Sequence, residues 1–181
     1  MKKHEIIIAG FGGQGVMSAG SILAYMGMME GKKTSWFPMY GPEKRGGTAA
    51  CHTIISDNLI GSPVVENPGI LIVMNEPSLD KYEEILIPGG TLIMDNSFIK
   101  RKPYRNDINL VQLSATKMAS ELGNITFANI IIIGALVAKT DVLSDKYFEN
   151  ALFSVLPKEK HYMIPEEVEA FNIGLNNTKY L

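Results

Sequence analysis

The chain alternates short apolar runs with amphipathic stretches, which is the pattern of a sheet covered by helices. Runs rich in β-branched residues at 5–9, 69–74 and 91–95 are bounded by turn residues and indicate strands buried on both faces. Less uniform patterns predict further strands at 33–37, 48–56 and 108–113. Helical spacing of apolar residues predicts helices at 16–30, 77–86, 115–122, 127–140, 145–156 and about 165–175.

The recurring order strand–helix–strand predicts an α/β fold, a three-layer sandwich with a mainly parallel Rossmann-like sheet. A length of 181 residues suits a single domain over residues 1–181. Beyond Pro157 the sequence becomes polar, so we expect a C-terminal appendage at about 157–181.

Charge and hydropathy exclude several classes of partner. The net charge is -2 at pH 7, which gives no general attraction to nucleic acid or to an anionic membrane. The longest apolar stretch, 130–138, is far shorter than the roughly 20 residues needed to span a bilayer. The N-terminal apolar run lacks a small-residue cleavage site, so we expect a cytoplasmic protein.

Cysteine and histidine are too sparse for a metal centre. Cys51 is the only cysteine, which excludes an intrachain disulfide and the thiolate set of an iron–sulfur cluster. The three histidines, at 4, 52 and 161, lack the spacing of a zinc site. Cys51 and His52 are neighbours in a predicted strand, so their side chains point to opposite faces and form no catalytic pair. We therefore expect no metal ligand and no catalytic residue on this chain.

A glycine-rich turn follows the first predicted strand and opens the first predicted helix. Gly10, Gly12 and Gly15 match the GxGxxG spacing, which allows a tight turn and brings backbone amides to a helix N-terminus. A phosphate-bearing ligand, an NAD or FAD site, and close packing alone are the alternatives. The dinucleotide alternative is weakened because Glu30 lies at the end of the helix, and the next strand ends at Pro38 without an acid.

The segment 40–47 is the most distinctive part of the sequence. It reads Tyr-Gly-Pro-Glu-Lys-Arg-Gly-Gly, so charged residues stand between glycines. A solvated turn is the simplest interpretation of such a loop. However, Pro38 and Pro42 stiffen it, and Arg45 beside two glycines presents an uncovered planar donor fork.

Together these motifs resemble the gamma subunits, or gamma domains, of the 2-oxoacid:ferredoxin oxidoreductases. In that family a strand leads into Gly-x-Gly-Gly-Gln-Gly, and a Tyr-Gly-x-Glu-x-Arg-Gly-Gly loop follows, as at 10–15 and 40–47 here. The resemblance extends through most of the chain. It continues at Pro88-Gly89-Gly90, at Ala115-Thr116-x-x-Ala119-x-x-Leu122-Gly123, and at Asn129 with Gly134-Ala135.

The resemblance implies a reaction in which a 2-oxoacid, coenzyme A and oxidised ferredoxin give acyl-CoA, carbon dioxide and reduced ferredoxin. Known types act on 2-oxoglutarate, pyruvate or ketoisovalerate. Thiamine diphosphate, magnesium and iron–sulfur clusters are implied to sit on the alpha, beta and delta subunits, with none bound by this chain alone. The chain is then inactive by itself and meets ferredoxin only through the complex. A dehydrogenase that binds NAD or FAD, and an assembly subunit without a ligand, are the alternatives.

Both motifs follow predicted strands, so they are expected to share one site at the carboxyl edge of the sheet. Coenzyme A is the candidate ligand, held by helix-terminal amides and by cationic side chains. Glu43 is expected either to pair with Arg45 or to fix the loop against a partner subunit. The predicted site residues are Gly12, Gly13, Gln14, Gly15, Tyr40, Glu43, Lys44, Arg45 and Gly46. Because a subunit taken from its complex exposes apolar surface, we also expect dimers of the isolated chain.

Overall fold

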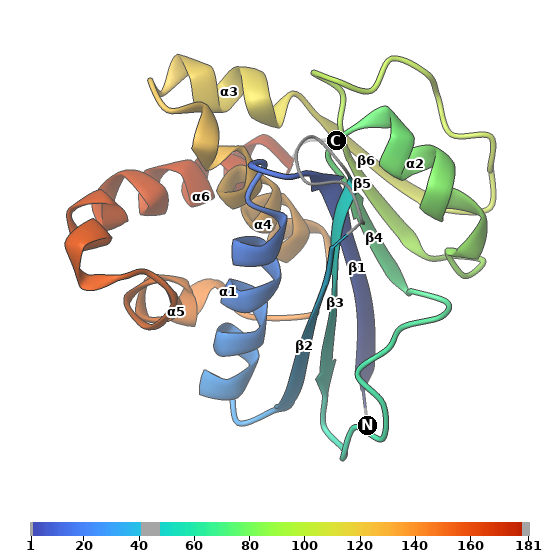
Figure 1. Cartoon of the computed structure of the whole chain (residues 1–181), viewed down its shortest axis with the longest axis horizontal. Helices are drawn as coiled ribbons and strands as arrows, with labels where there is room; N and C mark the ends of the chain where they lie inside the picture. Colours follow the sequence, from blue (N-terminus) through green and yellow to red (C-terminus); the bar gives the residue numbers. More distant parts are fainter. Residues whose placement is uncertain (1, 41–47, 179–181) are drawn as a thin grey trace.

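The computed structural model describes residues 2–40 and 48–178, which form a sheet between two layers of helices (Figure 1). The strand order is β2-β3-β1-β4-β5-β6. The strands are β1 (Lys3–Phe11), β2 (Lys33–Tyr40), β3 (Thr48–Ser56), β4 (Ile70–Val73), β5 (Thr91–Asp95) and β6 (Asn109–Leu113). The α-helices are α1 (Val16–Met29), α2 (Glu76–Tyr82), α3 (Ala115–Glu121), α4 (Ala128–Lys139), α5 (Phe148–Val155) and α6 (Ile164–Thr178). Short 3-10 helices are η1 (Glu83–Ile85), η2 (Ile125–Phe127), η3 (Asp145–Tyr147) and η4 (Lys158–Met163).

The sheet is mainly parallel, as predicted, with one reversed strand. The pairs β1–β4, β4–β5 and β5–β6 are parallel, whereas β3 runs antiparallel to both β1 and β2. The connection 41–47 between β2 and β3 is too short for the crossover that a parallel pair requires. The chain therefore turns back directly, and β3 inserts between β1 and β2.

Each face of the sheet is covered because the strands alternate their apolar side chains. Ile6 and Ile8 of β1 pack into the core that contains α1, α4, α5 and α6. Ile7 and Ala9 pack on the opposite side, in the core that contains α2. The strand residues are therefore apolar almost without interruption, which is the pattern read from the sequence.

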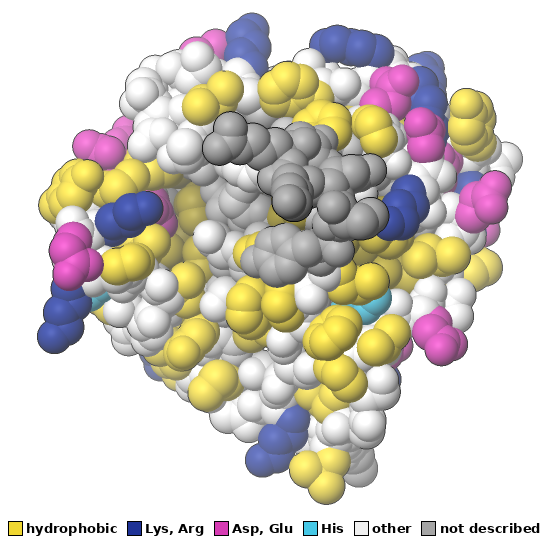
Figure 2. All heavy atoms as spheres, viewed as in Figure 1, with side chains coloured by type: hydrophobic (Ala, Val, Ile, Leu, Met, Phe, Trp, Pro, Cys, Tyr) yellow, Lys and Arg dark blue, Asp and Glu magenta, His cyan; other side chains and the backbone are white. Residues whose placement is uncertain are grey.

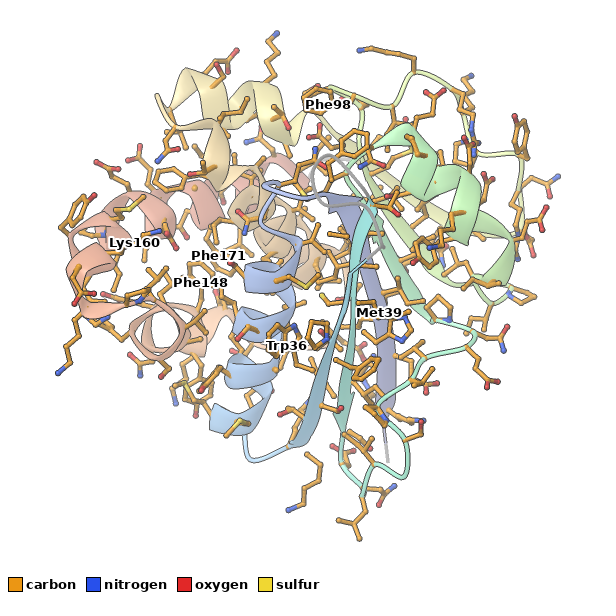
Figure 3. The ribbon with its side chains drawn as sticks, viewed as in Figure 1. Trp36, Met39, Phe98, Phe148, Lys160 and Phe171 are labelled. Atoms are coloured by element: carbon orange, nitrogen blue, oxygen red, sulfur yellow. The ribbon has the colours of Figure 1, made fainter. Side chains whose placement is uncertain are left out.

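Two glycines let α4 and α6 cross at backbone distance. A Cβ atom added to Gly134 would lie 2.1 Å from the carbonyl oxygen of Phe171, and one added to Gly174 would lie 1.9 Å from that of Ile131. Beside this crossing, the ring of Phe171 stacks on that of Phe148 of α5, with centroids 3.9 Å apart (Figure 3). Helix α6 is thus part of the main core, while the predicted division at about 157 stays a prediction.

An apolar surface remains exposed on the edge strand β2. Trp36, Phe37 and Met39 are each between a third and two-fifths exposed. Figure 2 shows hydrophobic side chains gathered over β2 and β3 in the lower half of the view, where Figure 3 places Trp36 and Met39. Among the described residues, no helix combines the length and hydropathy needed to cross a membrane.

Candidate functional site

The glycine turn lies between β1 and α1, at the carboxyl edge of the parallel strands. Gly13 and Gly15 have φ values of 98° and 75°, which residues other than glycine rarely adopt. At Gly15 an added Cβ would also lie 2.5 Å from the Nδ2 atom of Asn129. The Asn129 amide instead donates a hydrogen bond of 3.1 Å to the carbonyl of Gly15. The turn is therefore fixed against the start of α4.

Gln14 holds the turn together from inside. Its Oε1 accepts hydrogen bonds from the Phe11 N–H at 2.6 Å and from the Asn75 amide at 3.3 Å. Its Nε2 donates to the carbonyl of Met74 at 3.1 Å. Asn75 in turn caps α2 by accepting a hydrogen bond from the Ser78 N–H. The side chain that the sequence assigned to ligand binding thus joins the ends of β1 and β4.

Among the described residues, nothing packs on the outer side of the turn at Gly12 and Gly13. A Cβ placed on Gly12 or Gly13 would meet no described atom within 4 Å. The N-terminus of α1 has no acidic residue in its first turn, and among the described residues no side chain caps it. Backbone amides at such a helix start favour an anion that can approach closely.

The glycine turn and the strand ends that flank residues 41–47 lie at one edge of the sheet. Phe11 at the end of β1 pairs with Thr48, and Tyr40 at the end of β2 pairs with Ala49. The connection 41–47 therefore starts and ends beside the glycine turn. The predicted site residues Glu43, Lys44, Arg45 and Gly46 lie outside the described residues.

A pocket of about 240 Å³ adjoins the turn. It is lined by Phe11, Gly13, Gln14, Met74, Phe98, Thr116, Ile125, Thr126 and Ala128. These residues come from segments far apart in the sequence, which is why the sequence pattern could not assemble them. The sequence does indicate that Phe11 and Met74 stand at strand ends. This is a signal for a site, because ligands collect at the carboxyl ends of parallel strands.

One wall of the pocket is fixed by a buried carboxylate at the end of β5. Asp95 is fully buried and accepts hydrogen bonds from the Ser97 N–H at 3.0 Å and the Thr116 N–H at 3.1 Å. The Thr116 hydroxyl also donates to Asp95. These bonds hold the start of α3 beside the loop that carries Phe98, and Figure 3 places Phe98 near α3.

The arrangement does not favour a dinucleotide site. Glu30 lies at the far end of α1, away from the turn, where its carboxylate accepts a hydrogen bond from the Ser144 N–H. The reversed β3 lies between β1 and β2, so β2 is not a direct neighbour of β1 as it is in the classical mononucleotide unit.

Cys51 and His52 of β3 point to opposite faces, as expected. The Cys51 thiol is fully buried and donates to the carbonyl of Val16, whereas His52 Nδ1 accepts from the Val65 N–H. Burial raises the pKa of the Cys51 thiol to about 12. The side chain therefore remains a neutral thiol near neutral pH, and a neutral thiol is a weak nucleophile.

Comparison with known proteins places this fold among oxidoreductase subunits. The ketoisovalerate oxidoreductase subunit VorA of Methanothermobacter thermautotrophicus is 37% identical over 86% of this chain, which spans only 33% of VorA. The 2-oxoglutarate synthase subunit KorC of Methanocaldococcus jannaschii is 33% identical over 86% of this chain and 85% of its own.

The crystal structure of the keto/oxoacid ferredoxin oxidoreductase gamma subunit from Geobacter sulfurreducens superposes with a TM-score of 0.83. The two sequences are 29% identical, and the match covers 98% of this chain and 99% of that one. The profile of the pyruvate ferredoxin/flavodoxin oxidoreductase family matches residues 5–177. The chain therefore belongs to the pyruvate ferredoxin/flavodoxin oxidoreductase family.

Proposed function

We propose that the chain is the gamma subunit of a 2-oxoacid:ferredoxin oxidoreductase that forms acyl-CoA and carbon dioxide from a 2-oxoacid and coenzyme A. The observation that carries this proposal is the family match over residues 5–177, which includes both signature motifs. The relatives include VorA and KorC, whose names concern ketoisovalerate and 2-oxoglutarate. A branched-chain oxoacid and 2-oxoglutarate are accordingly the substrates to assay first.

The redox and decarboxylation chemistry is assigned to the alpha, beta and delta subunits. Thiamine diphosphate, magnesium and iron–sulfur clusters are placed on those partner subunits in this proposal. Within residues 2–40 and 48–178, no three His, Cys, Asp or Glu side chains come together in a way that could hold a metal ion. Cys51 is buried as a neutral thiol, which also argues against a cluster ligand. The chain is then inactive alone and works in the cytoplasm within a hetero-oligomer that passes electrons to ferredoxin.

The glycine turn is proposed to hold a phosphate of coenzyme A. Gly12 and Gly13 leave room for a ligand to approach the backbone, and the uncapped start of α1 supplies amides. Gln14 contributes by bracing the turn, and Lys44 and Arg45 supply positive charge from the neighbouring loop. When bound, coenzyme A would receive the acyl group, and this chain would only position it.

The test is reconstitution of the complex with and without this chain, followed by assay of 2-oxoacid-dependent ferredoxin reduction. Activity that is unchanged when the chain is omitted would refute the proposed function. In the complete complex, Arg45→Ala should raise the Michaelis constant for coenzyme A by about tenfold or more, because a charge-assisted hydrogen bond contributes roughly 1.5–3 kcal/mol. Loss of assembly in this variant would instead make the loop a subunit contact, and unchanged kinetics would make it a solvated turn.

A further inference from the structure

The pocket beside the glycine turn has the composition of a docking site for a protein side chain. Phe11, Met74, Phe98, Ile125 and Ala128 provide its apolar lining. No charged residue is among the described residues that line it. A small-molecule site normally adds a few polar groups that converge on the ligand and fix its orientation.

Here the polar side chains that line the pocket already have partners within the chain. The Gln14 amide bonds to Phe11, Met74 and Asn75. The Thr116 hydroxyl donates to Asp95, and the Thr126 hydroxyl donates to Asn124 at 2.6 Å. A polar or charged group deep in the pocket would lose its hydration and find no unpaired side chain among the described lining residues, so an apolar occupant is favoured.

The rim of the pocket is unusually apolar for a free surface. The side chains of Phe11, Phe98 and Ile125 are 36%, 50% and 56% exposed. They come from the end of β1, from the loop after β5 and from η2, so the opening is bordered by three separate segments. Exposed aromatic and aliphatic side chains around an apolar pocket are the arrangement found where a partner inserts an anchoring side chain.

We propose that this pocket receives one apolar side chain, of the size of leucine, methionine or phenylalanine, from a partner subunit of the oxidoreductase. The inference rests on the proposed function. Two observations fix the occupant: the uncharged lining matches an uncharged group, and a volume of about 240 Å³ has room for a single large side chain. In VorA the region matched is only 33% of a longer chain, so there the same fold is joined to further protein. The pocket lies beside the proposed coenzyme A site, so docking would close the complex around that site.

The experiment measures binding of the full chain to the reconstituted alpha and beta subunits by biolayer interferometry. Phe98→Asp and Ile125→Asp place a charge at the rim, where both native side chains are at least half exposed and the fold should tolerate the change. Leu59→Asp is the matched control, because Leu59 is 88% exposed and follows β3, which ends at the opposite edge of the sheet. Each rim variant should weaken binding by about tenfold or more, as loss of an interface anchor does, and the control by less than about twofold.

Phe98→Leu keeps the rim apolar and should bind like the wild-type chain, and circular dichroism should show all variants folded. If the wild-type chain binds the subunits and both rim variants bind equally well, the docking inference is overturned while the proposed function stands. If the wild-type chain does not bind at all, the proposed function itself fails. Two further results would overturn the inference. One is rim variants that only dissociate a dimer of this chain. The other is rim variants that leave assembly intact but abolish the stabilisation of the complex against unfolding by coenzyme A.

Discussion

The glycine crossing of α4 and α6 gives the sharpest prediction about stability. Gly134→Ala would place a Cβ atom 2.1 Å from the Phe171 carbonyl oxygen, and Gly174→Ala would place one 1.9 Å from that of Ile131. Ordinary contacts between heavy atoms of this kind lie at roughly 3.5 Å. Because the obstructing atoms belong to helix backbones, rotation of a side chain cannot relieve the clash, and the helices must move apart by about 1 Å or more.

The expected cost follows from two opposing terms. Overpacking a well-filled core costs typically about 1–3 kcal/mol, and backbone clashes belong at the upper end of that range. Alanine gains back roughly 1 kcal/mol because it is a better helix former than glycine. Each variant should therefore lose about 2 kcal/mol of unfolding free energy. That is a large share of the roughly 5–15 kcal/mol that stabilises a typical domain.

Urea unfolding followed by circular dichroism measures this loss. Gly61→Ala is the control, because no described atom lies within 4 Å of its added Cβ and its φ is not positive. The double variant should lose less than the sum of the single variants, since a single separation of the helices relieves both clashes. Unfolding free energies of Gly134→Ala and Gly174→Ala equal to wild type would show that the helices do not cross at backbone distance.

Two further predictions concern buried ionisable groups. Glu167 is 6% exposed, its Oε2 has no hydrogen-bond partner among the described residues, and burial raises its pKa from 4.5 to about 7, opposed by Lys160. The folded state then holds a proton that the unfolded state releases, so the unfolding free energy should fall as pH rises from about 4.5 to about 7, by at most about 3 kcal/mol. Glu167→Gln should remove most of this slope in urea titrations, and an unchanged slope would assign it to other groups. Cys51, with its thiol pKa raised to about 12, should resist alkylation by iodoacetamide at pH 8 in the folded protein and react on unfolding. Rapid labelling of the folded chain would contradict its burial.

The regular part of the fold could be predicted because its signals are local. The strand predicted at 91–95 has the same bounds in the structure, and the buried helix predicted at 127–140 is observed as Ala128–Lys139. Apolar periodicity and flanking glycines fix such elements without reference to the rest of the chain. Strand order is different, because it depends on pairing between distant segments. The only sequence signal for the reversed β3 is the short connection 41–47, which leaves no room for a parallel crossover.

The position of the glycine turn could be predicted from the sequence, but the hydrogen bonds that hold it could not. The turn could be predicted because the spacing of Gly10, Gly12 and Gly15 after a strand is typical of a tight turn before a helix. The structure shows positive φ at Gly13 and Gly15, where glycine is favoured. The hydrogen bonds of Gln14 could not be predicted, because nothing in its sequence neighbours shows that Met74 and Asn75 lie beside it. Phe98 and Ile125 were not identified either, since a pocket rim assembled from separate loops leaves no periodic pattern in the sequence.

The crossing of α4 and α6 also bears on how the protein is made. Helix α4 ends at Lys139, but the surface of Ile131 and Ala135 is covered by a helix that begins only at Ile164. During synthesis, this apolar surface of the layer containing α1, α4 and α5 stays exposed until residues 164–178 have left the ribosome. Over that interval the nascent chain exposes a hydrophobic surface that chaperones can bind and that is buried in the folded protein. Ribosomes paused before residue 164 should therefore carry the form of this chain that is most prone to aggregation.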